Sequence, residues 1–298
     1  MRVSSNTVSD GIVRQIQQLS SQQAKLQNQV GTGLRISQPE DDPAAVGRVL
    51  NLQSERRQLT QFGNNAARAL EVAQASASGM QGIKKISDRA GELATLGTGA
   101  VGASAMSGYG AEAGQLLEQA LQVANTRFNG DYIYAGSKVD APPFVATRDG
   151  SGAITSVAYA GDAAQPTIPI SEASSISPTT DGTTNAGIAA FLNHLVSLRD
   201  ALNTGSVSGV AAAQATLATS EDVLVDTIAD NGGVQTRIEA SQSQQSDRMT
   251  SLDSLISSET DADLPSTIVK LSQTQTAYQA ALQSAANIMR LSLLDYLK

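Results

Sequence analysis

The side chains best able to do chemistry in this sequence are its one histidine and two pairs of aspartates. His194 has no second histidine and no cysteine with which it could bind zinc. Asp41 and Asp42 are adjacent, so their side chains point in different directions, and one of them is better explained as a helix cap. Asp261 and Asp263 are interpreted as capping residues on the same argument. We therefore predict no catalytic, cofactor-binding or metal-binding residue, and we place His194 on a partly exposed helix surface.

Sequence motifs of common enzymes are missing as well. The run Gly31-Thr32-Gly33 lacks the third glycine and the preceding strand of a phosphate-binding loop, so we interpret it as a turn that ends a helix. The chain has no Gly-x-Ser-x-Gly run, no Walker sequence and no dinucleotide fingerprint. We predict that the protein is not an enzyme and uses no cofactor.

Composition narrows the possible partners. The chain has 298 residues and a formal net charge of −8, and its Lys and Arg residues form no dense patch, so neither nucleic acid nor a membrane is an expected partner. No apolar run approaches the length of a membrane span, and the first residues lack the apolar core of a cleaved signal peptide. With 3% aromatic residues and no tryptophan, the sequence favours long helices with thin, Ala-rich seams.

The two ends of the chain carry the elements around which the rest is organised. Residues 264–297 predict one long helix, with Asp263 as N-cap and Pro265 in the first turn. Its heptad seam is Leu264, Ile268, Leu271, Gln275, Tyr278, Leu282, Ala285, Met289, Ser292 and Tyr296. A second seam near the N-terminus is Ile12, Ile16, Leu19, Gln23, Leu26 and Val30.

We expect these two helices to pair antiparallel and to form the assembly interface of the protein. Such pairing would place Val30 near Leu264 and Gln23 level with Gln275, where the two glutamines are hypothesised to form a buried polar layer. Both segments are almost uncharged, so they lack the flanking charges with which coiled coils select one partner. The seams are too thin to order the helices alone, and we predict that neighbouring copies complete their packing.

The middle of the chain predicts a helical bundle with a β insertion. Asp42 and Pro43 begin a long helix that runs past Leu93, although the spacing of Ser37 and Glu40 also fits a capping box. A Gly-rich loop at 97–110, a helix at 111–128 and a short strand at 132–134 are expected next. The β insertion is expected to contain a hairpin at 144–147 and 154–159, a third strand at 167–170 and a polar loop at 171–185. Two further helices are expected, one from 186 and one at 210–256 that residues 231–233 could interrupt.

These elements predict a mainly α fold with nested segments, in which paired terminal coiled-coil helices and a long-helix bundle enclose a small β-rich insertion in a rod. The expected parts are an N-terminal coiled-coil segment at 1–36, the first part of the bundle at 37–140, the β insertion at 141–186, the second part of the bundle at 187–256, and a C-terminal coiled-coil segment at 257–298.

Several stretches resemble the bacterial flagellin superfamily. The run G-T-G-L-R-I-S-Q-P-E-D-D-P-A-A at 31–45 looks like the N-terminal region of that family, and D-A-D-L-P at 261–265 with the final helix looks like the C-terminal region. The block N-T-R-F-N-G-D-Y-I-Y-A-G-S-K at 125–138, the run Pro-Pro-Phe at 142–144 and the ending Leu-Leu-Asp-Tyr-Leu at 293–297 resemble members that lie between the flagellar hook and its filament.

The resemblance implies a flagellin-like rod with a structural role. It implies export through the flagellar type III system without a cleaved signal, with a cytosolic chaperone on the C-terminal region. It also implies an extracellular place in the flagellum, as a ring of copies of this chain between the first hook-associated protein and flagellin. Two alternatives stay open at this point: a short filament flagellin, and a flagellin-like protein that carries an enzyme in its insertion.

Overall fold

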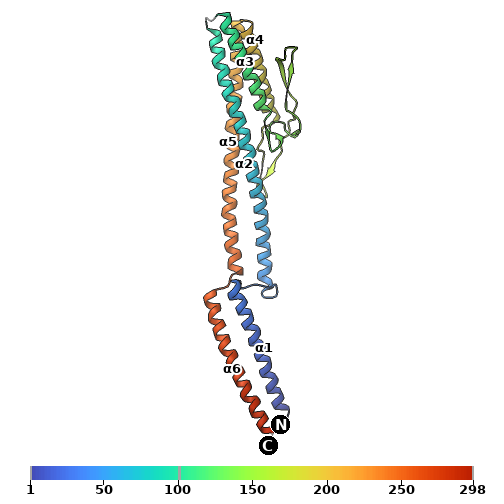
Figure 1. Ribbon diagram of the computed structural model, residues 1–298, viewed down its shortest axis with the longest axis vertical. Coiled ribbons are helices and arrows are strands. Elements are labelled where there is room, and N and C mark those ends of the chain that lie inside the picture. Colours follow the sequence, from blue (N-terminus) through green and yellow to red (C-terminus); the bar gives the residue numbers. More distant parts are fainter. Residues whose placement is uncertain (1, 100–101, 297–298) are drawn as a thin grey trace. The chain divides into compact units, whose positions relative to one another are not determined.

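A computed structural model describes residues 2–99 and 102–296, with side chains at 10–99 and 102–287. The described chain is mainly helical and contains three small antiparallel strand pairs, which confirms the predicted fold class (Figure 1). Its helices are α1 (Arg2–Thr32), α2 (Pro43–Thr98), α3 (Ala103–Ala124), α4 (Gly182–Asn203), α5 (Val207–Thr260) and α6 (Leu264–Tyr296).

Internal contacts divide the molecule into two compact units. Unit 1 comprises Met1–Gln58 together with Arg248–Lys298, and unit 2 comprises Leu59–Asp247. The five-part division expected from the sequence is finer than this and stays a prediction.

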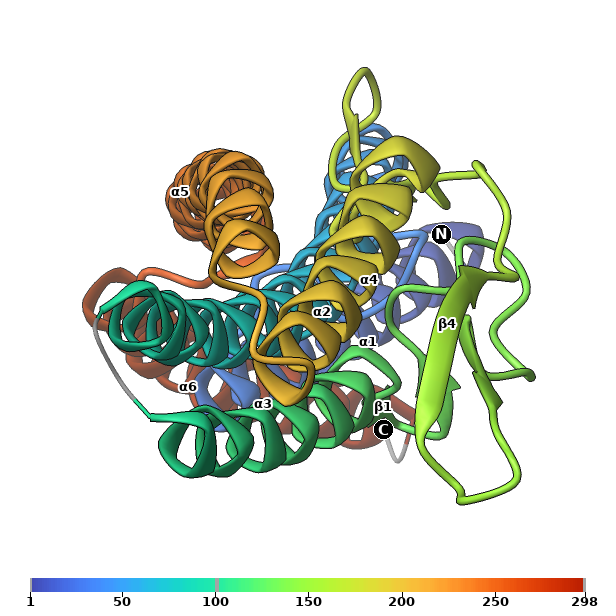
Figure 2. The same ribbon diagram turned by 90° about the horizontal axis from the view of Figure 1, so that it is seen from above.

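Unit 2 contains the main hydrophobic core. In this unit α3 packs on α4, and strand β4 (Ile154–Tyr159) lies against α4, as Figure 2 shows. The largest fully buried side chains include Met80, Leu117, Tyr134, Phe144, Phe191, Leu192, Leu195 and Leu198. Helices α2, α3, α4 and α5 therefore enclose a conventional apolar core, to which the β segment contributes aromatic side chains.

The predicted Gly-rich loop at 97–110 is wrong, because α3 already begins at Ala103. Gly110 lies inside the helix, where a Cβ atom would collide with the side chain of Asn203 on α4. A Cβ at Gly97 near the end of α2 would likewise meet Leu202. These glycines permit close approach between helices instead of marking an irregular loop.

Helix α3 ends earlier than predicted, at Ala124, because a tight hairpin follows it. Strand β1 (Arg127–Phe128) pairs with β2 (Asp131–Tyr132), and the connecting residues Asn129 and Gly130 have φ values of 53° and 98°. Two consecutive positive φ angles are typical of the turn that an Asn-Gly pair prefers. The predicted strand at 132–134 is thus displaced by one residue, and Ile133 and Tyr134 enter the core.

The hairpin predicted next is confirmed, as β3 (Phe144–Arg148) pairs with β4, and Phe144 lies opposite Tyr159. The third predicted strand is the two-residue β5 (Ile168–Pro169), which pairs with β6 (Ser175–Ile176) inside the expected polar loop. Helix α4 begins four residues before the predicted start, because Asp181 caps it by accepting a hydrogen bond from the Thr184 amide at 2.7 Å. Residues 231–233 do not interrupt α5.

Unit 1 contains the terminal helices. Helices α1 and α6 lie side by side and run antiparallel, which confirms the predicted pairing (Figure 1). The beginning of α2 and the end of α5 complete this unit.

Candidate functional site

Helix α1 presents its predicted seam to α6. Leu26 is buried with 8% of its surface exposed, and the other five seam positions are half-buried. Most of the residues between them are exposed. The six seam residues Ile12, Ile16, Leu19, Gln23, Leu26 and Val30 therefore all lie on the side of α1 that packs within the subunit.

Helix α6 packs through a face that contains three residues of the predicted seam, Leu271, Tyr278 and Ala285, but is rotated away from the others. Thr267, Thr274 and Ala285 are buried, and Leu271, Tyr278 and Ala281 are half-buried. These six residues, which we call the inner seam, follow steps of four and three residues and face α1. Four of these six residues, two threonines and two alanines, are thus small side chains.

Four members of the predicted seam of α6 are exposed instead. Leu264, Ile268 and Leu282 have 41%, 52% and 43% of their surface exposed, and Gln275 is exposed as well. We call these four residues the outer stripe. The side chains of Met289, Ser292 and Tyr296, also part of the predicted seam, lie outside the described residues.

The hypothesised buried glutamine layer is not formed within the subunit. Gln23 is half-buried on α1, but Gln275 belongs to the outer stripe of α6 and is exposed. At its level of the helix, the buried residue is Thr274, whose hydroxyl donates to the backbone oxygen of Lys270 at 2.8 Å. The polar group in the packed seam is therefore satisfied by its own helix.

Two short segments, 33–42 and 261–263, form a joint next to the terminal helices. Gly33 ends α1 with a φ of 73°, as the sequence predicted, and Leu34 forms an antiparallel bridge with Asp261. The Arg35 amide donates to the oxygen of Thr260 at 2.7 Å, and the Ala262 amide donates to the oxygen of Gly33 at 2.8 Å. These backbone bonds clamp the two segments together.

Both helices that leave the joint are capped as predicted. Asp42 accepts from the Ala45 amide at 3.0 Å at the start of α2, and Asp263 accepts from the Ser266 amide at 3.3 Å at the start of α6. The prediction that Asp261 caps a helix is wrong. Its carboxylate accepts from Ser257 and Thr260 at the end of α5.

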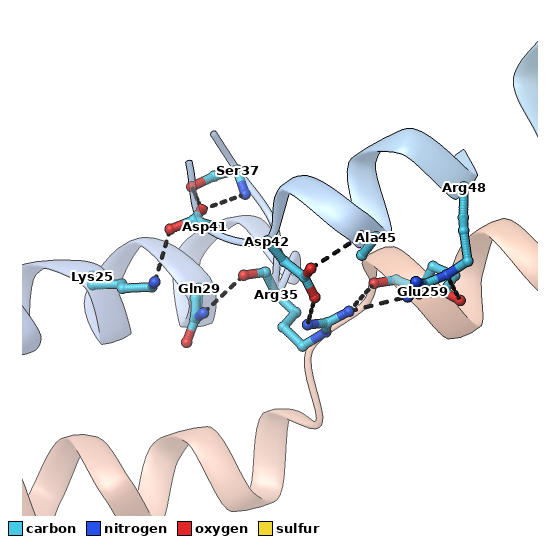
Figure 3. Close-up of polar contacts among 9 residues, drawn as sticks. All are labelled: Lys25, Gln29, Arg35, Ser37, Asp41, Asp42, Ala45, Arg48 and Glu259. Carbon is cyan, nitrogen blue, oxygen red and sulfur yellow. Dashed lines mark hydrogen bonds and ion pairs between the residues drawn. The ribbon is translucent and has the colours of Figure 1, made fainter. Parts of the chain in front are cut away.

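Charged side chains reinforce the joint, as Figure 3 shows. Arg48 donates to both oxygens of Glu259 at 2.9 and 2.8 Å, which is the bidentate geometry that best matches a guanidinium to a carboxylate. Arg35 bonds Asp42 at 3.2 Å and the backbone oxygen of Glu259 at 2.7 Å. Residues more than two hundred positions apart in the sequence are thereby connected.

A further ion pair ties α1 to the same joint. Lys25 lies 2.8 Å from Asp41, which also accepts hydrogen bonds from the amides of Ser37 and Gln38, both at 3.0 Å. Asp41 and Asp42 therefore act as separate structural anchors, one for the joint segment and one for α2.

These contacts lower the pKa values of the carboxylates. The hydrogen bond from Lys25, followed by those from the amides of Ser37 and Gln38, holds the pKa of Asp41 well below its ordinary value. The Ala45 amide and then Arg35 lower the pKa of Asp42, and Arg48 lowers the pKa of Glu259. The joint is therefore stabilised in the ionised state of its carboxylates.

The histidine and the possible metal ligands show no arrangement suited to catalysis or metal binding in the described part of the chain. His194 is half-buried on α4, as predicted, with its Nδ1 atom 2.8 Å from the Ser220 hydroxyl, and burial lowers its pKa. Among the described residues, no group of three or more His, Cys, Asp or Glu side chains is placed to hold a metal ion. The helices in the described part of the chain include none that is apolar enough over a sufficient length to cross a membrane.

The ionic joint was not predicted from the sequence, and neither were three residues of the inner seam of α6, Thr267, Thr274 and Ala281. Arg48 and Glu259 carry no shared motif, because their pairing depends on the tertiary fold. The inner seam did leave a signal, since Thr267, Leu271, Thr274 and Tyr278 form a second heptad phase that overlaps the predicted one.

Comparison with known proteins gives one family match and a set of similar structures. Residues 3–139 match the bacterial flagellin N-terminal helical region. Flagellar hook-associated protein 3 of Salmonella typhimurium is 26% identical over 146 residues, which covers 48% of this chain and 46% of the relative. The aligned part is thus about half the length of that relative.

Solved structures share the fold over most of the chain. A putative flagellar hook-associated protein from Vibrio parahaemolyticus is 16% identical with a TM-score of 0.66, covering 74% of this chain and 100% of that one. FlgL from Bacillus cereus is 19% identical with a TM-score of 0.61, covering 70% of this chain and 99% of that one.

Proposed function

Since residues 3–139 match the bacterial flagellin N-terminal helical region, we propose that this chain is a structural protein of the bacterial flagellum at the junction of hook and filament. Its relatives are described as flagellar hook-associated proteins and as FlgL. In this proposal several copies form a ring between the first hook-associated protein and the flagellin filament. The chain reaches that place by type III export, with a cytosolic chaperone on its C-terminal region, and stays extracellular.

One observation carries this proposal: the terminal helices pair within the subunit but leave large apolar residues uncovered. Leu264, Ile268 and Leu282 face solvent on α6, whereas α1 uses its seam for the pairing. Exposed apolar stripes on weakly charged helices are typical of surfaces that a partner covers. The assembly interface expected at the two helices therefore stays a proposal for contacts between copies.

A short filament flagellin is the competing function. The resemblance of residues 125–138 and 293–297 to junction members of the family favours the junction role. An enzymatic function has no support in the described residues. The insertion has no histidine, and its carboxylates Asp162 and Asp181 accept hydrogen bonds from the amides of Ser137 and Thr184.

Electron microscopy of bacteria that lack this chain tests the proposal. A junction protein predicts hooks of normal length without filaments, and flagellin lost to the medium. Filaments that are present but short or altered would support the filament flagellin instead, and normal flagella would contradict both functions.

Two substitutions within α6 test whether the junction function depends on this helix. Leu271→Asp should prevent filament attachment while unit 2 stays folded by circular dichroism, because a carboxylate enters the inner seam and disrupts the pairing of α6 with α1 on which the assembly interface depends. Gln273→Asp, which adds the same charge at an exposed position two residues away, should leave attachment intact. Equal behaviour of the two variants would show that the junction function does not depend on the packing of α6 against α1.

A further inference from the structure

Unit 1 contains an apolar groove beside the joint. It has a volume of about 430 Å³ and lies between the joint segment, the first turns of α2 and the end of α5. The apolar residues that line it include Leu34, Ile36, Pro39, Val46, Leu50 and Ile256. Leu50 has 56% of its surface exposed and Leu34 has 37%, so the subunit leaves part of this groove uncovered.

The groove is uncharged as well as apolar. Its lining residues include no Asp, Glu, Lys or Arg, and its polar members are hydroxyl and amide side chains such as Ser37, Gln38 and Gln53. The ionic pairs of the joint, between Arg48 and Glu259 and between Lys25 and Asp41, use residues that do not line it. Depletion of charge at an exposed apolar patch is typical of the centre of a protein–protein interface.

The outer stripe of α6 has matching properties. Leu264, Ile268, Gln275 and Leu282 recur at intervals that keep them on one face of a helix, over a length of about 27 Å. This face lies about a quarter turn from the inner seam that binds α1, so a second partner can reach it while the terminal helices stay paired. The charged residue of this segment, Lys270, falls on the other side by helical periodicity.

We propose that the groove beside the joint binds the outer stripe of α6 from a second copy of this chain. This inference rests on the proposed function, because it assigns a contact between copies. An amphipathic helix that places apolar anchors in a hydrophobic groove is a common mode of recognition. The occupant is a second copy because the stripe and the groove are both apolar and both free of charge, and because unit 1, which contains them, has nearly equal numbers of basic and acidic residues. Two copies can therefore bring these surfaces together without charge repulsion.

The contact is heterologous, because the groove and the stripe are different surfaces of one subunit. Each copy that places its stripe in a neighbour keeps its own groove free for the next copy, so such contacts generate rings or helical assemblies and not closed dimers. A groove of this size receives only a few side chains, while stable pairs bury about 1,200–2,000 Å². The isolated chain is therefore monomeric when dilute, and the contact gains strength by repetition around an assembly.

Cysteine cross-linking of the purified full chain tests this contact, because the natural sequence has no cysteine. We expect the double variant Leu50→Cys with Ile268→Cys, concentrated and treated with a short bis-maleimide, to give a ladder of trimers and larger species. The matched control combines Leu50→Cys with Gln273→Cys, which is exposed on another face of α6, and should stay largely monomeric. Mixing the two single variants should give dimers that neither single variant forms alone.

Three results would overturn the inference: no multimers, products that stop at the dimer, or an equally strong ladder from the Gln273→Cys control. The cross-link is measured in purified protein, and the junction function is measured by microscopy of cells. A missing ladder with normal loss of filaments in cells would reject the groove contact alone, whereas a ladder without any filament phenotype would reject the proposed junction function.

Discussion

The two units of this chain differ in charge. Unit 1 contains eleven Lys and Arg residues and ten Asp and Glu residues, so its net charge is close to zero. Unit 2 contains nine basic and eighteen acidic residues, so it carries the whole negative charge of the protein. Self-repulsion keeps an acidic surface apart from other copies, whereas a neutral surface permits close association. The difference indicates that association concentrates in unit 1.

The units also differ in what their apolar residues do. Unit 2 buries Tyr134, Phe144, Phe191 and its core leucines almost completely. Unit 1 buries few large side chains and exposes Leu50, Ile268 and Leu282. One unit therefore completes its core within the subunit, while the other retains apolar surface that needs a neighbour.

A matched pair of Leu→Ala substitutions provides the strongest test of this difference. Leu192→Ala in unit 2 removes a fully buried side chain of α4 and should lower the free energy of unfolding by about 2–5 kcal/mol. Leu282→Ala in unit 1 removes an exposed side chain and should change it by less than about 0.5 kcal/mol. Urea titration of the dilute full chain measures both values, and similar losses would show that unit 1 has its own closed core.

The close packing of α3 on α4 in unit 2 predicts smaller changes in the free energy of unfolding, and these changes have opposite signs at two glycines. Gly110→Ala places a methyl group against Asn203 and should cost about 1–3 kcal/mol, since the backbone nitrogen of Asn203 is also only 3.3 Å from the new atom. Gly108→Ala in the same helix meets no atom within 4 Å and should stabilise the protein by about 0.5–1 kcal/mol. Thermal unfolding measures both, and a stabilising Gly110→Ala would contradict the close packing of α3 on α4.

In unit 2 a hairpin was predictable from the sequence, whereas the role of Gly97 and Gly110 was not. Alternation located the hairpin of β3 and β4, whereas the first strand of the hairpin at Asn129 and Gly130 was predicted as the end of a helix. Gly97 and Gly110 gave the same local signal as a loop, although both lie in helices. A contact with Leu202 or Asn203 on another helix cannot be deduced from neighbours in the sequence.

In unit 1 the helices were predictable but their faces were not. The seam of α1 is unambiguous, because large apolar residues occupy one heptad phase. On α6 the predicted seam shares Leu271, Tyr278 and Ala285 with the inner seam. The apolar residues Ile268 and Leu282 indicated the outer face, while Thr267 and Thr274 pack on α1. Hydrophobicity alone cannot separate a face that packs within a subunit from a face left for a partner, since both are apolar.

Breaking an ion pair of the joint should have the smallest effect on stability, because these pairs are partly exposed to solvent. Removing the charge with Glu259→Gln should accelerate amide hydrogen exchange at residues 33–36 and 260–262 without changing exchange in the core of unit 2. The bidentate bond to Arg48 is lost, while the backbone bonds between the two segments remain. Glu40→Gln, an exposed carboxylate in the same segment, is the control and should leave exchange at the joint unchanged.

Lowering the pH should accelerate amide exchange at the joint, as Glu259→Gln is expected to do. The pKa values of Asp41, Asp42 and Glu259 are lowered by their hydrogen bonds to Lys25, to the Ala45 amide and to Arg48, respectively. Groups with lowered pKa values stabilise the folded joint above their ordinary values near 4, and this contribution is lost as the pH falls through the folded values. Exchange at the joint, corrected for its intrinsic pH dependence, should therefore rise below about pH 4 in the natural chain and rise less in Glu259→Gln. A joint that opens instead on raising the pH would show that its carboxylates do not hold it.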